Sequence, residues 1–226
     1  MTASIHIEDN HSFEHQAYQT IKERLLSGKL GVDKLYSENL LSKALGISRT
    51  PVRYALKQLE AEGFIQYQKN RGVTVKTVPL REMIEILGIS ILFQKAAVAH
   101  VKAGYATFSF NELDQLADEA QTLRNNQSYL DYLKKILQIY NTIISAAHNQ
   151  TMLAMHQLNW ERLIVASITN GYRQGNIVVP AKKQTTIGQI KDIIEYLRND
   201  HYADAVNAYD ELLVYSTCQI SYYSFL

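Results

Sequence analysis

Apolar residues recur at helical spacing in three short segments near the N-terminus of the chain. The first segment, residues 13–27, is followed by Gly28, which favours a helix end. The second opens at Ser37, a residue type that caps helix N-termini, and ends at Gly46. The apolar positions that give these two helices a core-facing side are Ala17, Ile21, Leu25, Leu40, Leu41, Ala44 and Leu45.

The third segment predicts a helix that is capped by Ser48 and ends at Gly63. Pro51 falls at its third position, where the backbone N–H has no acceptor within the helix, so proline is tolerated. The apolar residues repeat at the spacing of one helix face: Val52, Ala55, Leu56 and Leu59. The polar and basic residues therefore lie on the other side: Arg49, Thr50, Arg53 and Lys57.

Strict alternation of apolar and polar residues replaces the helical spacing after Gly63. Apolar or aromatic residues occupy every second position of residues 65–68 and 73–75, and Lys69-Asn70-Arg71-Gly72 supplies a turn between them. The pattern predicts a two-stranded hairpin. Two short helices joined by a tight turn and followed by a basic hairpin form a winged helix-turn-helix.

The pattern changes again after Pro79, and helical spacing extends to the C-terminus. The interpretation is a mainly α protein with a winged helix-turn-helix domain at residues 10–76, a linker at 77–81 and a helical domain at 82–226. Helices in the second domain are expected at 81–103, 110–124, 128–147, 150–170, 183–199 and 201–223.

The composition argues against several classes of protein. The 226 residues contain no apolar run of 18, so no membrane span is expected, and the polar, acidic start does not fit a signal peptide. A single cysteine, Cys218, predicts a buried, inert thiol in a reducing cytoplasm. The sequence holds no phosphate-binding glycine loop, nucleophile elbow or paired histidines for a catalytic metal, so an enzyme and a cofactor are not expected.

Charge is concentrated where the predicted helix-turn-helix lies. Residues 43–76 hold seven Lys or Arg and two Glu, although the whole chain has a net charge of only +1. A basic block on a near-neutral chain indicates a polyanionic partner for that block alone. The alternative is that these cations only solvate a surface helix.

The predicted third helix and the hairpin together favour double-stranded DNA as the partner. Arg49, near the helix N-terminus, could pair with both guanine O6 and N7, and Arg53 could reach a base or a phosphate. Ser48 and Thr50 offer hydroxyl groups to a phosphate. The basic residues of the turn, Lys69 and Arg71, would approach the DNA backbone, and Gly72 permits a tight turn.

The run LSKALGISRTPVRYALKQLEAEGFIQYQKNRGVTV resembles the DNA-binding domain of the GntR family of bacterial transcription regulators, over about residues 13–76. The resemblance implies base and phosphate contacts by Ser48, Arg49, Thr50, Arg53 and Lys69 to Gly72, with Asn70 among them. Two residues depart from the family pattern: Tyr54 replaces a usual glutamate, and Asn39 replaces an arginine that some relatives use for phosphate. Both could shift operator preference.

The helical half is similar to the ligand-binding domain of the FadR-type branch (the FCD fold), an antiparallel bundle of six or seven helices. The run IYNTIISAAHN at residues 139–149 carries this resemblance. Many members hold a divalent metal through one Asp and three His, but the matching positions here are non-ligating or poor ligands. They are Ile136, Tyr140, Ile190 and Leu212, with Ser90 and Gln94 in place of an Arg and a Glu.

These substitutions predict that the metal site is absent and that an apolar cavity replaces it. Side chains could fill that cavity, or a small and relatively apolar metabolite could bind there as an effector. The candidate lining residues are Ser90, Gln94, Tyr140, Asn149, Arg162 and Arg173, whereas His100, His148 and His156 are interpreted as structural.

Two functional hypotheses remain open. In the first, the protein is a homodimeric, effector-responsive repressor, because one winged helix reads only a half-site and a palindromic operator matches two-fold symmetry. In the second, the helical domain is only a dimerisation module and binds no effector.

Overall fold

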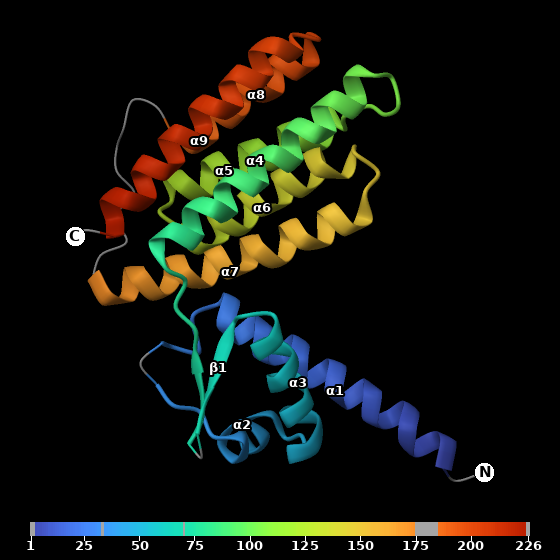
Figure 1. Cartoon of the computed structure of the whole chain (residues 1–226), viewed down its shortest axis with the longest axis vertical. Helices are drawn as coiled ribbons and strands as arrows, with labels where there is room; N and C mark the ends of the chain where they lie inside the picture. Colours follow the sequence, from blue (N-terminus) through green and yellow to red (C-terminus); the bar gives the residue numbers. More distant parts are fainter. Residues whose placement is uncertain (1–2, 33, 70, 175–184, 225–226) are drawn as a thin grey trace. The chain divides into compact units, whose positions relative to one another are not determined.

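The computed structural model describes residues 3–32, 34–69, 71–174 and 185–224, without the side chains of 3–12, 170–174 and 221–224. Within these ranges the chain forms nine helices and a two-stranded hairpin (Figure 1). It divides into two compact units, the first built mainly on Met1–Thr77 and the second on Val78–Ile164 and Asn170–Leu226. The predicted fold class, a winged helix-turn-helix followed by an all-α bundle, is confirmed.

The N-terminal unit packs three helices against one another and against a hairpin. The helices are α1 (Ala3–Leu26), α2 (Glu38–Leu45) and α3 (Arg49–Ala61), and the strands are β1 (Ile65–Gln68) and β2 (Gly72–Val75). Helix α3 lies between α1 and α2 and carries the chain into β1. Most of the apolar positions that the periodicity picked out lie in the core of this unit, together with Phe64: Ala17, Ile21, Leu25, Leu41, Val52, Ala55, Leu56, Leu59 and Val73. On α2 the prediction was wrong for Leu40, which is 53% exposed, and for Ala44 and Leu45, because only Leu41 of this short helix is buried.

The two boundaries of this unit differ slightly from the prediction. Helix α1 begins at Ala3, ten residues before the expected start. The apolar positions that revealed the helix lie only in its C-terminal half, so periodicity could not locate its first residue. At the other end, Pro79 is the N-cap of the next helix, which begins at Leu80 inside the expected linker.

Helix α2 and helix α3 are capped differently. The Ser37 side chain accepts a hydrogen bond from the Leu40 N–H, as a capping serine should. Ser48 occupies the N-cap position of α3, but its side chain makes no capping bond. The third residue of α3 is Pro51, which has no N–H to donate, so the usual partner is missing. The predicted cap at Ser48 is therefore correct in position and wrong in its hydrogen bond.

The predicted hairpin is present, and its strands pair with Ile65 opposite Val75 and Tyr67 opposite Val73. Gly72 has a φ of +122°, and a Cβ at this position would overlap the carbonyl oxygen of Tyr36. The backbone of Tyr36 exchanges two hydrogen bonds of 2.9 Å with Val73, so the loop before α2 lies directly against β2. Gly72 is needed for this close approach as well as for the turn.

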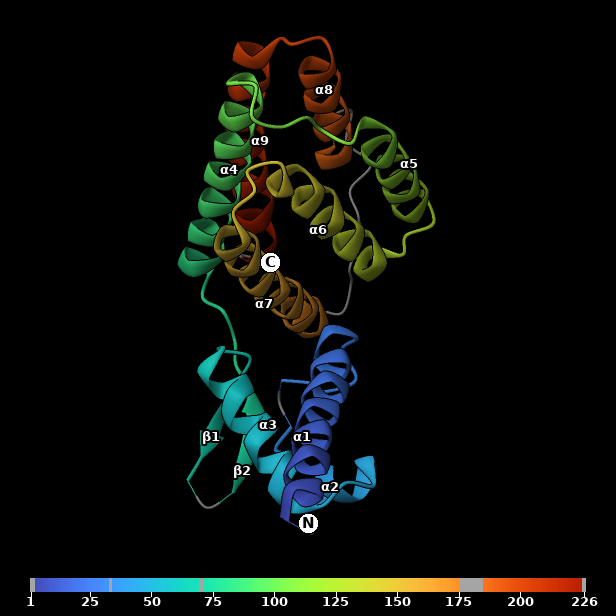
Figure 2. The same ribbon diagram turned by 90° about the vertical axis from the view of Figure 1, so that its right-hand side faces the viewer.

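The C-terminal unit consists of six helices. They are α4 (Leu80–Lys102), α5 (Phe110–Asn125), α6 (Tyr129–Ser145), α7 (Gln150–Gln174), α8 (Thr186–Arg198) and α9 (Tyr202–Ser224), close to the predicted ranges. Helix α4 packs against α6 and α9, and α5 packs against α6 and α8 (Figure 2). Isoleucine and leucine side chains from α4, α6, α8 and α9 form the centre of the bundle.

One feature of this unit differs from the expectations, and a second bears on the membrane prediction without contradicting it. Cys218 is exposed on α9, not buried, because it lies on the same outward side as Val214. Helix α4 is long and apolar enough to cross a membrane by length and composition alone, a test that core helices of soluble proteins also pass. Only 39% of its most apolar stretch is buried in the chain.

Candidate DNA-binding surface and the cavity of the helical unit

Helix α3 presents one polar face to solvent. The predicted contact residues Arg49, Thr50, Arg53 and Lys57 are all exposed on it, whereas the apolar stripe of the same helix is fully buried. Burial of that stripe against α1 fixes the rotation of α3, so the polar face cannot turn inward without exposing four apolar residues. Lys57 Nζ lies 6.0 Å from the centre of the Tyr54 ring, within the range of a cation–π contact.

Arg53 is held by an acidic residue of α2. Its Nε donates to both carboxylate oxygens of Glu38, at 3.2 and 3.1 Å, and its Nη2 donates to Oε2 at 2.9 Å. The hydroxyl of Tyr67, on β1, donates to the same carboxylate at 3.4 Å. Glu38 therefore joins α2, α3 and the hairpin.

The electrostatics agree with this geometry. Hydrogen bonds from Arg53 lower the pKa of Glu38, so the carboxylate stays ionised near neutral pH. Burial, and then the neighbouring Glu38 charge, raises the pKa of Tyr67 to about 12. Tyr67 thus remains a neutral hydroxyl donor to the ionised carboxylate.

The other predicted contact residues lie around this surface. Ser48, whose hydroxyl is not used for capping, and Asn39 on α2 are exposed. Lys69 and Arg71 are exposed at the two ends of the hairpin turn. Asn70 between them lies outside the described residues. The N-terminal unit thus exposes hydroxyl groups, an amide and several cations on α2, on α3 and at the turn of the hairpin.

Sequence patterns did not reveal Glu38 as part of this surface. Glu38 and Arg53 are 15 residues apart and on different helices, so neither the i, i+4 spacing nor a charge count predicts their pairing. The sequence held only a weak signal that Glu38 belongs to this surface. Glu38 is the first residue after the Ser37 cap of α2, and that position lies close to the crossing of the two helices.

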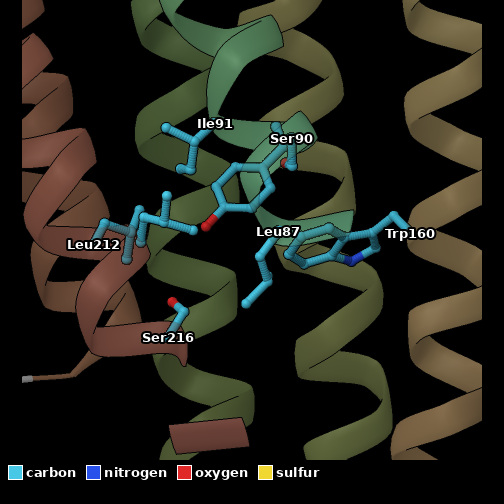
Figure 3. A pocket seen from close by; sticks show the side chains of 8 residues that line it. Leu87, Ser90, Ile91, Trp160, Leu212 and Ser216 are labelled. Carbon is cyan, nitrogen blue, oxygen red and sulfur yellow. The ribbon is translucent and has the colours of Figure 1, made fainter. Parts of the chain in front are cut away.

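A small cavity lies in the bundle between α4, α6, α7 and α9. It is lined by Leu87, Ser90, Ile91, Tyr140, Trp160, Leu212, Leu213 and Ser216. Figure 3 shows Leu87 and Trp160 on one side of it and Leu212 and Ser216 on the other. Its volume is about 10 Å³, which admits at most one water molecule.

A chain of buried polar side chains lies beside the cavity. Nδ1 of His156 is 2.7 Å from Oδ1 of Asn141, and its Nε2 is 2.9 Å from Oγ of Ser90. Because an amide oxygen only accepts, Nδ1 carries the proton and Nε2 accepts from the serine hydroxyl. Burial lowers the pKa of His156 to about 4, so the ring is neutral. This histidine is structural and hydrogen-bonded, as expected.

Aromatic rings fill the space beside His156. Its ring stacks on Trp160 with centroids 5.8 Å apart, and Tyr140 meets Trp160 edge-on at 4.9 Å. Burial, followed by the effect of Tyr132 and Tyr209, raises the pKa of Tyr140 well above its ordinary value. The side chains of Tyr140 and Trp160 therefore fill the space that a polar ligand would need.

The predicted pocket residues are only partly brought together. Ser90 and Tyr140 line the cavity, as does Leu212. Gln94 is fully buried one turn from Ser90, and its Oε1 has no hydrogen-bond partner in the described part of the chain.

The remaining pocket candidates lie away from the cavity. The side chain of Asn149 accepts from Met152 N–H at 3.0 Å and caps α7 at the surface. Arg162 pairs with Glu82 on α4. The side chain of Arg173 lies outside the described residues. Local partners thus account for Asn149 and for the two Nη atoms of Arg162, whereas the buried Nε of Arg162 has no hydrogen-bond partner in the described part of the chain.

The positions that correspond to metal ligands in the FCD resemblance hold buried apolar groups. Ile136, Ile190 and Leu212 are each 1% exposed. Among the residues that the structure describes, no three His, Cys, Asp or Glu side chains come together in a way that could hold a metal ion.

Part of the chain is similar in sequence to known proteins. Residues 13–75 match the model of the gntR family of bacterial regulatory proteins. The chain is 23% identical over 137 residues to the uncharacterized HTH-type transcriptional regulator YdhC of Bacillus subtilis, covering 60% of this chain and 61% of that protein. Residues 13–75 of the N-terminal unit are thus similar to the gntR family of bacterial regulatory proteins.

Two solved structures share the fold over nearly the whole chain. Escherichia coli McbR/YncC is 19% identical with a TM-score of 0.75, and the alignment covers 92% of this chain and 97% of that one. A protein from Rhodococcus sp. RHA1, named as a GntR transcriptional regulator, is 15% identical with a TM-score of 0.77 and the same coverage. At these identities the likeness concerns the fold alone.

Proposed function

We propose that this protein is a cytoplasmic transcription regulator that binds double-stranded DNA through its N-terminal unit. The exposed face of α3 carries the proposal, because burial of its apolar stripe leaves Arg49 and Thr50 at an outward-facing helix N-terminus. A helix in this position can enter the major groove with its N-terminal residues at base edges. Lys69 and Arg71, on the hairpin turn, are then free to contact the DNA backbone.

The regulator acts as a homodimer on a palindromic operator. One winged helix contacts a single half-site, and two-fold symmetry in the protein is matched by two-fold symmetry in the DNA. Occupation of an operator that overlaps a promoter would block transcription, so the expected sign is repression. A reporter gene under the upstream promoter of this gene measures the sign directly.

The small volume of the bundle cavity bears on the role of the helical unit. A cavity of about 10 Å³ cannot hold a metabolite, and an effector would have to displace Tyr140 or Trp160. For this cavity, within the described part of the bundle, the volume favours a helical unit that serves as a dimerisation module over one that senses a ligand here. A thermal-shift screen with metabolites and acyl thioesters tests the choice, because a reproducible, concentration-dependent stabilisation would support the effector hypothesis.

Selection from a random-sequence duplex library tests the DNA-binding function. The full chain is expected to enrich a palindromic sequence with two half-sites about one helical turn apart. Failure to bind any duplex at low salt, where electrostatic binding is strongest, would contradict the proposal.

Lys69→Ala is expected to weaken binding to every duplex alike. A side chain that contacts phosphate contributes counterion release and no base discrimination, so its loss should lower the slope of log K against log salt concentration by about 1. Fluorescence anisotropy at several salt concentrations measures the slope on the selected duplex and on a scrambled one. A change in the ratio of the two affinities, with an unchanged slope, would place Lys69 away from the phosphates.

A further inference from the structure

Glu38 places an ionised carboxylate on a surface that carries several exposed cations. Its side chain is 17% exposed, and Arg49, Arg53 and Lys57 are exposed on the neighbouring helix α3. Hydrogen bonds from Arg53 lower the pKa of Glu38, so the negative charge is present at neutral pH. A negative charge at this place repels the phosphates of a duplex. By itself, therefore, the carboxylate is unfavourable for DNA binding.

The stability of the fold gives little reason for this charge. The side chain of Arg53 is 51% exposed, and an ion pair with so exposed a partner contributes little to the free energy of unfolding. The Ser37 side chain already caps α2 by accepting a hydrogen bond from the Leu40 N–H, without help from the Glu38 carboxylate. What the carboxylate does fix is the side chain of Arg53.

The carboxylate engages one edge of the Arg53 guanidinium. Nε donates to both oxygens of Glu38, at 3.2 and 3.1 Å, and Nη2 donates to Oε2 at 2.9 Å. These bonds use the Nε–H and one N–H of Nη2, so the second N–H of Nη2 and both N–H groups of Nη1 remain. A fork of two parallel donors, one from each Nη, is thus open to a partner that presents two acceptors.

A tyrosine of the hairpin also holds the carboxylate. The hydroxyl of Tyr67 donates to Oε1 of Glu38 at 3.4 Å, and the Tyr67 N–H donates to Oε1 of Glu60 on α3 at 2.9 Å. Glu38 therefore contacts α3 and β1, while its backbone belongs to α2. Because three elements fix its position, the carboxylate can hold the guanidinium of Arg53 in one orientation.

The charge of Glu38 also discriminates between the two partners that Arg53 could take on DNA. A phosphate is an anion, which the adjacent carboxylate repels, and the carboxylate offsets the positive charge that would attract it. The major-groove edge of a guanine is uncharged and presents O6 and N7 as two acceptors. The pairing with Glu38 therefore weakens binding of Arg53 to phosphate more than binding to guanine.

We propose that Glu38 is a positioning and specificity-determining residue, which directs Arg53 to a guanine of the half-site and away from the DNA backbone. This inference rests on the proposed DNA-binding function and deepens it by naming the partner of Arg53. The guanidinium is oriented before DNA arrives, which reduces the side-chain entropy lost on binding. Arg49 and Arg53 are about 6 Å apart along α3, so they read base pairs within about two steps of each other.

Glu38→Gln tests this role, because glutamine preserves the size of the side chain and removes the charge. We expect the ratio of affinities for the selected duplex and a scrambled duplex to fall about two- to tenfold. Affinity for the scrambled duplex should rise, because the released Arg53 can contact phosphate, and the slope of log K against log salt concentration should steepen by up to about 1. Fluorescence anisotropy at several salt concentrations measures both. A merely structural role would instead lower both affinities and the thermal midpoint together.

Glu60→Gln is the matched control for the loss of one negative charge. Glu60 lies on α3 and does not contact Arg53, and the amide oxygen of glutamine can still accept from the Tyr67 N–H. Both affinities should rise by the same factor, which leaves their ratio unchanged. A ratio that falls as much in this variant as in Glu38→Gln would show that only net charge matters, and would overturn the positioning role.

Selection from the random-sequence duplex library locates the effect on the DNA. Glu38→Gln should weaken the preference at one base pair of each half-site, the same G·C pair at which Arg53→Ala loses it. A loss of preference spread evenly over the half-site would overturn the proposal, as would an unchanged set of selected sequences.

A double-mutant cycle shows whether Glu38 acts through Arg53. In an Arg53→Ala background, Glu38→Gln should leave the affinity ratio unchanged. An effect of the same size in that background would mean that Glu38 contacts the DNA itself, and would overturn the positioning role. An unmodified chain that binds all duplexes equally would also overturn that role and leave DNA binding intact. A chain that binds no duplex at low salt would instead overturn the proposed function.

Discussion

Arg49→Ala is expected to remove most of the discrimination between the selected operator and a scrambled duplex. Arg49 is the first residue of α3, exposed on the side opposite the buried stripe. From that position its guanidinium can donate to O6 and N7 of one guanine, a pairing worth about 1–3 kcal/mol against the wrong base. Specific affinity should therefore fall between about 5- and 150-fold. Fluorescence anisotropy at constant salt measures both affinities.

Arg49→Lys is the matched control, because it retains the positive charge but lacks the planar fork. We expect the lysine variant to bind scrambled DNA as well as the unmodified protein and to lose most of the operator preference. If the alanine variant keeps the same preference, base reading must come from other residues. Arg53 would then be the next candidate, since it lies one turn later on the same face.

Local pattern predicted the N-terminal unit well because its signals are themselves local. The buried stripe of α3 follows from spacing within one helix, and the hairpin follows from the alternation of apolar and polar residues at Ile65–Gln68 and after Gly72. Contacts between segments that are far apart in the sequence produce no such local pattern. The pairing of Glu38 with Arg53 depends on how two helices cross, and the requirement for Gly72 depends on the approach of Tyr36.

The helical unit shows a different limit of sequence reasoning. Substitution at positions such as Tyr140 and Leu212 predicted a changed cavity, and both residues line one. Residue identity could not decide whether that cavity is open, because its volume depends on how Tyr140, Trp160 and their neighbours pack together. His156 illustrates the same point, since nothing in the sequence spacing predicts its bonds to Ser90 and Asn141.

Acidification is expected to destabilise the helical unit through His156. Burial lowers its pKa to about 4, whereas an exposed histidine in the unfolded chain has a pKa near 6.5. At pH values between these two pKa values, His156 is protonated in the unfolded chain and neutral in the folded protein. The free energy of unfolding is therefore unaffected by this histidine above about pH 6.5 and falls as pH decreases toward 4. The total loss amounts to about 3 kcal/mol. Denaturant titrations followed by fluorescence of Trp160, the single tryptophan, report on this unit.

His156→Gln isolates this effect from the titration of carboxylates elsewhere in the chain. Glutamine can replace both hydrogen bonds, to Ser90 and to Asn141, but carries no titratable group. The variant should be less stable at pH 7, because the stacking on Trp160 is lost, and its stability should depend much less on pH between 6.5 and 4. An equal loss of stability in both proteins over that range would show that His156 is already protonated in the fold. Its Nε2 would then donate to Ser90, so the direction of that hydrogen bond would be reversed, while Nδ1 would still donate to Asn141.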